Sequence, residues 1–100
     1  MTTRCINVSD HSIATMSGSA QALISQDMTR SYLQIFNNGA DNLTLTFMAF
    51  AAAGGGGGAA GGSIVLVPNG AMTFNTGTIP GNAIQVTGTS GQPVTCYTSP

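Results

Sequence analysis

The chain has 100 residues, of which only five carry a formal charge, and its net charge at pH 7 is −1. Two arginines, Arg4 and Arg30, supply too little positive charge for the phosphate neutralisation that nucleic-acid binding requires, or for binding an anionic membrane surface. A typical domain is about 25% charged, so this nearly neutral exterior favours a subunit held in an assembly over a free monomer.

The N-terminal residues 1–12 are polar and lack the apolar core of a signal peptide, so we expect an N-terminal arm on a chain made in a cytoplasm. Arg4 of this arm is a candidate partner contact. Cys5 and Cys96 lie near opposite ends of the chain. A disulfide between them requires the first and last strands to be neighbours, whereas a cytoplasmic setting favours two reduced, buried thiols.

The segment "SDHS" at 9–12 contains the residue types of a catalytic triad. Adjacent residues of an extended chain point to opposite faces, so they cannot form a relay, and we expect turn residues that cap their own backbone. Glu is absent, the three Asp are scattered and His11 is the single histidine. The sequence therefore predicts no enzyme, no cofactor and no metal site.

Alternation of apolar and polar residues, which is typical of strands, runs through most of the chain. In "SYLQIFN", Leu33 and Ile35 share one face, and in "NLTLTFMAF" Leu43, Leu45, Phe47 and Ala49 do. "SIVLV" is apolar on both faces, and "AIQV" and "PVTCYT" follow. Further candidate strands are 4–8, 12–16 and 20–25, although "AQALISQDM" could form one or two helical turns.

Glycine-containing turns separate these segments. Asn38-Gly39 tolerates positive φ, and Asn69-Gly70 gives the strongest hairpin signal. Seven or eight short strands predict a single all-β domain over 1–100, an antiparallel sandwich of jelly-roll type. The expected core consists of Leu33, Ile35, Leu43, Leu45, Phe47, Ile64, Leu66, Phe74, Ile84, Val86 and Val94. The longest apolar stretch, 43–53, has about half the length of a membrane-spanning helix.

Glycine and alanine fill residues 51–62, with five consecutive glycines at Gly54, Gly55, Gly56, Gly57 and Gly58. A phosphate loop needs a following helix and a lysine, which this chain lacks, and collagen needs a three-residue glycine period. We therefore expect a flexible loop between strands, which acts either as a tether or as an arm in contact with a partner.

Arg30 precedes the strand "SYLQIF" and has Asp27 and Asp41 as possible ionic partners. A salt bridge at the rim of the fold is one expectation for Arg30, and a contact to a neighbouring subunit is the other.

The segments "TRSYLQIFNNGADNLTLTF", "GSIVLVPNGAMTF", "IPGNAIQVTG" and "SGQPVTCYT" resemble a group of small tailed-phage virion proteins over roughly residues 29–98. The matched positions are Arg30, Tyr32, Leu33, Ile35, Asn37, Asn38, Pro68, Gly70, Pro80, Ala83, Ile84, Gln92, Pro93, Val94 and Thr95. The long glycine run departs from the pattern of that group.

This resemblance implies a capsid decoration or cement subunit in a virion, assembled in the cytoplasm of a bacterial host. Its partners would be the major capsid protein or other virion proteins, and the chain would form a homo-oligomer, dimer or trimer. One alternative is a head–tail connector, tail or spike component. Another, from a different class, is a carbohydrate-binding adhesin module with Tyr32, Phe36, Tyr97 and Gln34 as its candidate platform.

Overall fold

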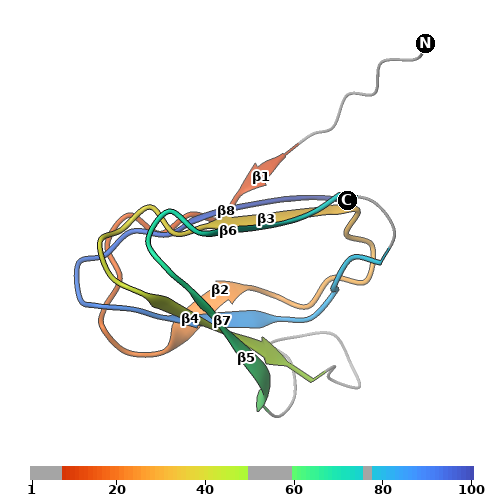
Figure 1. The fold of residues 1–100 in the computed structure, drawn as a ribbon. Helices are drawn as coiled ribbons and strands as arrows, with labels where there is room; N and C mark the ends of the chain where they lie inside the picture. Colours follow the sequence, from red (N-terminus) through yellow and green to blue (C-terminus); the bar gives the residue numbers. More distant parts are fainter. Residues whose placement is uncertain (1–7, 50–59, 76–77) are drawn as a thin grey trace.

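The structure of the protein, a computed structural model, describes residues 8–49, 60–75 and 78–100. It contains eight strands in two four-stranded sheets, ordered β1-β8-β3-β6 and β2-β7-β4-β5. Every strand pair is antiparallel, and the two sheets lie one above the other (Figure 1). The prediction of an all-β antiparallel sandwich is confirmed. The strands are β1 (Ser9–Asp10), β2 (Gln21–Ile24), β3 (Tyr32–Phe36), β4 (Leu43–Met48), β5 (Ala60–Leu66), β6 (Ala71–Phe74), β7 (Ile84–Thr87) and β8 (Thr95–Ser99).

Consecutive strands alternate between the two sheets, except that β4 and β5 pair within one sheet. The turn at Val67–Gly70 therefore carries the chain from one sheet to the other, and the hairpin predicted at Asn69-Gly70 is wrong. Pro68 and a φ of 66° at Asn69 are typical of a type II turn, which the 2.8 Å bond from Gly70 N to Val67 O closes.

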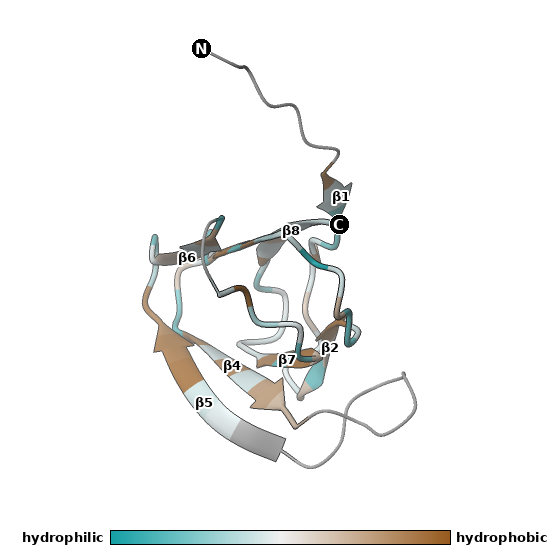
Figure 2. Ribbon diagram, turned by 90° about the vertical axis from the view of Figure 1, so that its right-hand side faces the viewer, coloured by the Kyte–Doolittle hydropathy of each residue, from teal (hydrophilic) through white to brown (hydrophobic). Residues whose placement is uncertain are grey.

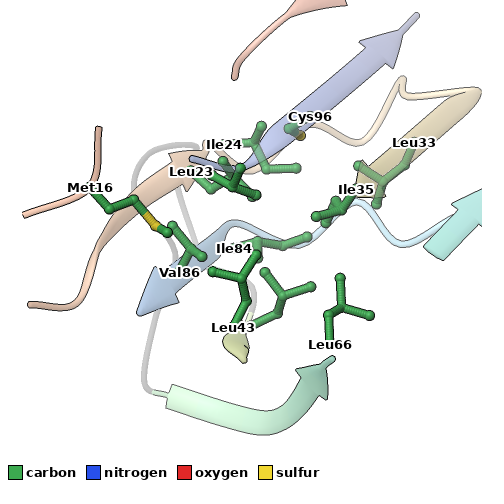
Figure 3. Close-up of a cluster of buried hydrophobic side chains, with 12 residues drawn as sticks. Met16, Leu23, Ile24, Leu33, Ile35, Leu43, Leu66, Ile84, Val86 and Cys96 are labelled. Atoms are coloured by element: carbon green, nitrogen blue, oxygen red, sulfur yellow. The ribbon is translucent and has the colours of Figure 1, made fainter. Parts of the chain in front are cut away.

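The predicted core is largely confirmed, because alternate residues of both sheets point between the layers. Figure 3 shows Leu43, Ile84, Val86 and Met16 pointing toward one another there. Phe47 and Phe74 are partly buried and pack against this cluster. Ile64, however, is 44% exposed, so its predicted core position is wrong. The core also contains Met16, Leu23, Ile24, Met48 and Ala83, which the prediction omitted, together with the buried thiol of Cys96.

The predicted alternation along β4 fails at the end of the strand, where Met48 is buried and Ala49 is exposed, the reverse of the predicted faces. The register with β5 also shifts between Thr46 and Met48, with the extra residue on β5 rather than on β4. The pairing of β4 with β7 continues without a shift through Phe47.

The N-terminal half forms fewer strands than expected. The helical alternative for 20–28 is wrong, because β2 occupies Gln21–Ile24 and pairs with β7. The candidate strand 12–16 is reduced to an isolated bridge between Ile13 and Val94. The candidate strand 4–8 falls almost wholly outside the described residues, and Val8 itself is not in a strand.

Positive φ occurs at Gly18, Asn69 and Gly91 among the described residues, and not at Asn38 or Gly39. Gly39 is required there for space instead. A Cβ at this position would lie 2.3 Å from Gln92 Cγ, well inside van der Waals contact.

Candidate functional site

Strand β5 forms an edge of the sandwich. With seven residues, Ala60–Leu66, it is the longest strand, and it ends the order β2-β7-β4-β5. One side of β5 pairs with β4, and no strand among the described residues pairs with its other side. Figure 1 shows β5 curving away from the opposite sheet, and Figure 2 shows it as the outermost strand. Its outer side therefore presents main-chain donors and acceptors that β4 does not use.

Large apolar side chains accompany this open backbone. Ile64 is 44% exposed, Val65 55% and Val67 57%, while Leu66 is only 7% exposed. Leu66 opposes Leu43 of β4 and anchors the C-terminal end of β5. We call the side chains of Ile64, Val65 and Val67, together with the main chain of β5 that faces away from β4, the β5 edge. Natural edge strands are commonly shielded by charged residues or proline, and residues 60–67 contain neither.

A hydrogen-bond network formed by the side chains of Asn37 and Gln92 holds the C-terminal end of β5 in place. The fully buried Asn37 Nδ2 donates to the carbonyls of Leu66 and Asp41, each at 2.9 Å. Its Oδ1 accepts from Gly39 N at 3.0 Å and from Gln92 Nε2 at 3.1 Å. Asn37 and Gln92 are positions that carry the sequence resemblance, and here they connect the turn after β3 to β5 and to the segment before β8.

Arg30 is buried, with 8% of its surface exposed, so the expected salt bridge at the rim is wrong. Its Nη1 donates to Pro80 O at 2.6 Å and to Asn82 O at 3.3 Å, and its Nη2 donates to Ser25 O at 2.8 Å. Burial lowers the pKa of the guanidinium, and the nearby Asp27 carboxylate opposes that shift. Within the chain Arg30 therefore ties the end of β2 to the loop before β7, and its predicted partner contact stays a prediction.

A hollow of about 300 Å³ lies beside Arg30 and also contains His11 and Asp27 in its lining. His11 Nε2 is paired with Thr98 Oγ1 at 2.9 Å. Asp27 Oδ1 accepts from Thr29 N at 2.9 Å and from Thr29 Oγ1 at 2.7 Å, and these bonds lower the pKa of the Asp27 carboxyl. His11 and Asp27 thus each have a different partner, and the hollow shows no nucleophile–base–carboxylate relay.

The turn predicted for the "SDHS" segment is only partly confirmed, because Ser9 and Asp10 form β1 and pair with β8. Asp10 Oδ1 accepts from Ser12 N at 2.8 Å, which satisfies the backbone just after β1. Hydrogen bonding to Ser12 lowers the pKa of the Asp10 carboxyl. Ser12 Oγ in turn accepts from Cys96 N at 3.0 Å, so this hydroxyl supports β8.

The aromatic candidates for carbohydrate binding gather on the outer face of one sheet. Gln34 of β3 lies opposite Tyr97 of β8, and Tyr32 Oη donates to Gln34 Oε1 at 3.1 Å. Phe36 is two residues further along the same face. All three rings are half-buried, so each offers only part of its face for stacking on a sugar.

Cys96 is a free, fully buried thiol, as the reduced alternative predicts. Burial raises its pKa to about 12. Cys5, Arg4 and Gly54–Gly58 lie outside the described residues, so the structure does not place these predicted contacts. The β5 edge itself was missed from sequence, although its signal was present: "SIVLV" is apolar at consecutive positions and cannot bury both faces at the margin of a sheet.

Two further observations concern the described residues alone. No helix there is long and apolar enough to cross a membrane. No three His, Cys, Asp or Glu side chains of that part of the chain gather in a way that could hold a metal ion.

No protein-family model matches the chain, and no curated protein matches it in sequence. In fold, it is similar to a chain from a solved structure described as "Bacillus endospore appendages form a novel family of disulfide-linked pili". The TM-score is 0.53 at 14% identity, and the match covers 99% of this chain and 91% of the other. At that identity the likeness shows a shared fold.

Proposed function

We propose that this protein is a non-enzymatic structural subunit that works inside a protein assembly. The observation that carries this proposal is the β5 edge, where Ile64, Val65 and Val67 are all more than two-fifths exposed beside main chain with which no other strand of the described residues pairs. Strand addition to such an edge gives affinity through main-chain hydrogen bonds and apolar contact, and it needs no pocket. An assembly would also cover the nearly uncharged exterior.

The more specific proposal is a decoration or cement subunit on the outside of a phage capsid, which the sequence resemblance supports. Arg30, Asn37 and Gln92, three of its matched positions, form internal hydrogen bonds that fix loops between strands. They are thus scaffold positions of a sandwich. A protein that binds only the assembled lattice stabilises that lattice by mass action. The partner in this case is the major capsid protein, and the location is the virion.

A fibre subunit is the second candidate, and the fold comparison favours it, because the similar chain belongs to a pilus. A chain that polymerises with itself needs two complementary surfaces, and the β5 edge would supply one of them.

Electron microscopy of particles from the source, with this chain traced in the density and counted by quantitative mass spectrometry, tests these proposals. A capsid decoration subunit is expected on heads in hundreds of copies per particle. A fibre subunit is expected in filaments that the purified chain also forms alone. Recovery of the chain only as a free protein, absent from every particulate fraction, would contradict the structural role itself.

A further inference from the structure

The β5 edge is complementary to itself in charge. Residues 60–67 carry no charged side chain, and the five charged residues of the chain all lie elsewhere in the sequence. Two copies of this strand can therefore meet without like charges facing each other and without desolvating an ion. A charged partner segment would find no counter-charge on this strand. The matching surface is another neutral strand with an open side, and a second copy of this chain supplies one.

We propose that β5 pairs antiparallel with β5 of a second copy about a two-fold axis, so that two four-stranded sheets become one continuous eight-stranded sheet. Such a contact uses the same patch on both subunits and closes on itself. This inference rests on the proposed structural function and deepens it by naming the first partner as this chain itself.

The side-chain pattern selects the register of this pairing. Opposed residues must share a face of the sheet. With the axis at Val65, that residue meets its own counterpart, and Ile64 meets Leu66. With the axis at Ile64, Val65 would meet Ser63 and Leu66 would meet Gly62, which removes less apolar surface from water. An axis at Leu66 would oppose Val65 to Val67, whose carbonyl already accepts from Gly70 N within the chain. The axis therefore lies at Val65, whose side chain is 55% exposed in the single chain.

The proposed contact is small. A standard stable interface covers about 800 Å² on each partner, and one seven-residue strand offers less than that. The dimer is therefore weak in dilute solution. It becomes populated at high protein concentration, or in an assembly where neighbouring contacts raise the effective concentration.

Sedimentation equilibrium of the full chain over a wide concentration series tests the pairing. Wild type is expected to show a monomer–dimer equilibrium. Val65→Lys places two ammonium groups across the axis and should weaken dimerisation at least about tenfold, which is 1.4 kcal/mol. Ala22→Lys is the matched control, because Ala22 is exposed on β2 at the opposite edge of the same sheet. Its dimerisation should equal that of wild type, and circular dichroism should show both variants folded.

Cross-linking tests the register independently. In a Cys5→Ser background, Val65→Cys should oxidise to a disulfide-linked dimer, because directly opposed residues of an antiparallel pair have Cβ atoms about 4.5–5.5 Å apart, so a small backbone adjustment brings them within the distance that a disulfide spans. Ala22→Cys in the same background should stay monomeric under the same oxidant. Cys96 is fully buried and present in both proteins, so it does not distinguish them.

Wild type that stays monomeric throughout the series would overturn the pairing, and so would dimers that survive Val65→Lys or are lost in Ala22→Lys. Open-ended filaments that Val65→Lys does not affect would overturn it as well. These results can be separated from the test of the proposed function. If the chain is found on particles but never pairs through β5, the structural function stands and the pairing is wrong. If the chain dimerises through β5 but is absent from all particles, the pairing stands and the structural function is wrong.

Discussion

Gln92 Nε2 donates a 3.1 Å hydrogen bond to Asn37 Oδ1 inside the protein, although 55 residues separate the two in sequence. The same amide of Gln92 also donates to Asp41 O, and Gln92 Oε1 accepts from Thr89 N at 3.1 Å. Two buried amide side chains thus satisfy the backbone of the turn after β3 and of the turn before β8. Because a buried polar group without a partner is costly, the Asn37–Gln92 hydrogen-bond network is a cooperative part of the fold.

Asn37→Ala is expected to destabilise the protein by about 2–4 kcal/mol, because it leaves Leu66 O, Asp41 O and Gly39 N with fewer partners. Urea unfolding followed by circular dichroism measures this change. Asn38→Ala, at the exposed neighbouring position, is the matched control and should change stability by less than about 0.5 kcal/mol. Equal stability of the two variants would show that the Asn37–Gln92 hydrogen-bond network does not stabilise the fold.

Arg30→Lys is expected to lower the free energy of unfolding by about 1–3 kcal/mol, because a single ammonium cannot replace a planar fork that reaches Ser25 O, Pro80 O and Asn82 O. Asp27→Asn removes the nearby charge but keeps an oxygen that can accept from Thr29, so its cost should stay below about 1 kcal/mol. A larger loss in Asp27→Asn than in Arg30→Lys would mean that ionic attraction, rather than the carbonyl bonds, explains the position of Arg30.

Stability should fall in strongly alkaline solution because of Cys96. Burial raises the pKa of this thiol from 9.0 to about 12, so between these values the unfolded chain releases a proton that the folded chain keeps. The contribution is fully present below pH 9.0 and is lost at up to about 1.4 kcal/mol per pH unit as the pH rises toward 12. Denaturant titrations of wild type and Cys96→Ala across this window isolate the thiol. Parallel curves for the two proteins would contradict the assignment.

Deleting Gly54–Gly58 should leave the sandwich folded. These residues join β4 to β5, and closure entropy varies only slowly with loop length, so stability should change by less than about 1 kcal/mol. Circular dichroism and thermal unfolding measure the result, and replacement of the five glycines by five serines separates the effect of length from that of composition. Loss of the β-type spectrum on deletion would contradict the loop prediction.

Local pattern was enough to predict most strands and most of the core. Leu33 and Ile35, or Val94 and Cys96, alternate with polar residues, and this period of two fixes which side chains face inward in any sandwich. The alternation failed at the end of β4, where Met48 is buried and Ala49 is exposed, the reverse of what a strict period of two predicts.

The sequence alone determined a small, nearly uncharged all-β sandwich, because composition and side-chain alternation are properties of the chain itself. Only the tertiary structure decided which strands lie at the margins, since strand order depends on contacts between distant segments. It placed β5 at an edge and left Ile64 exposed, and it enclosed Arg30 among backbone carbonyls. Burial depends on what packs against a residue, and for β5 and Arg30 that was settled by residues far away in the chain.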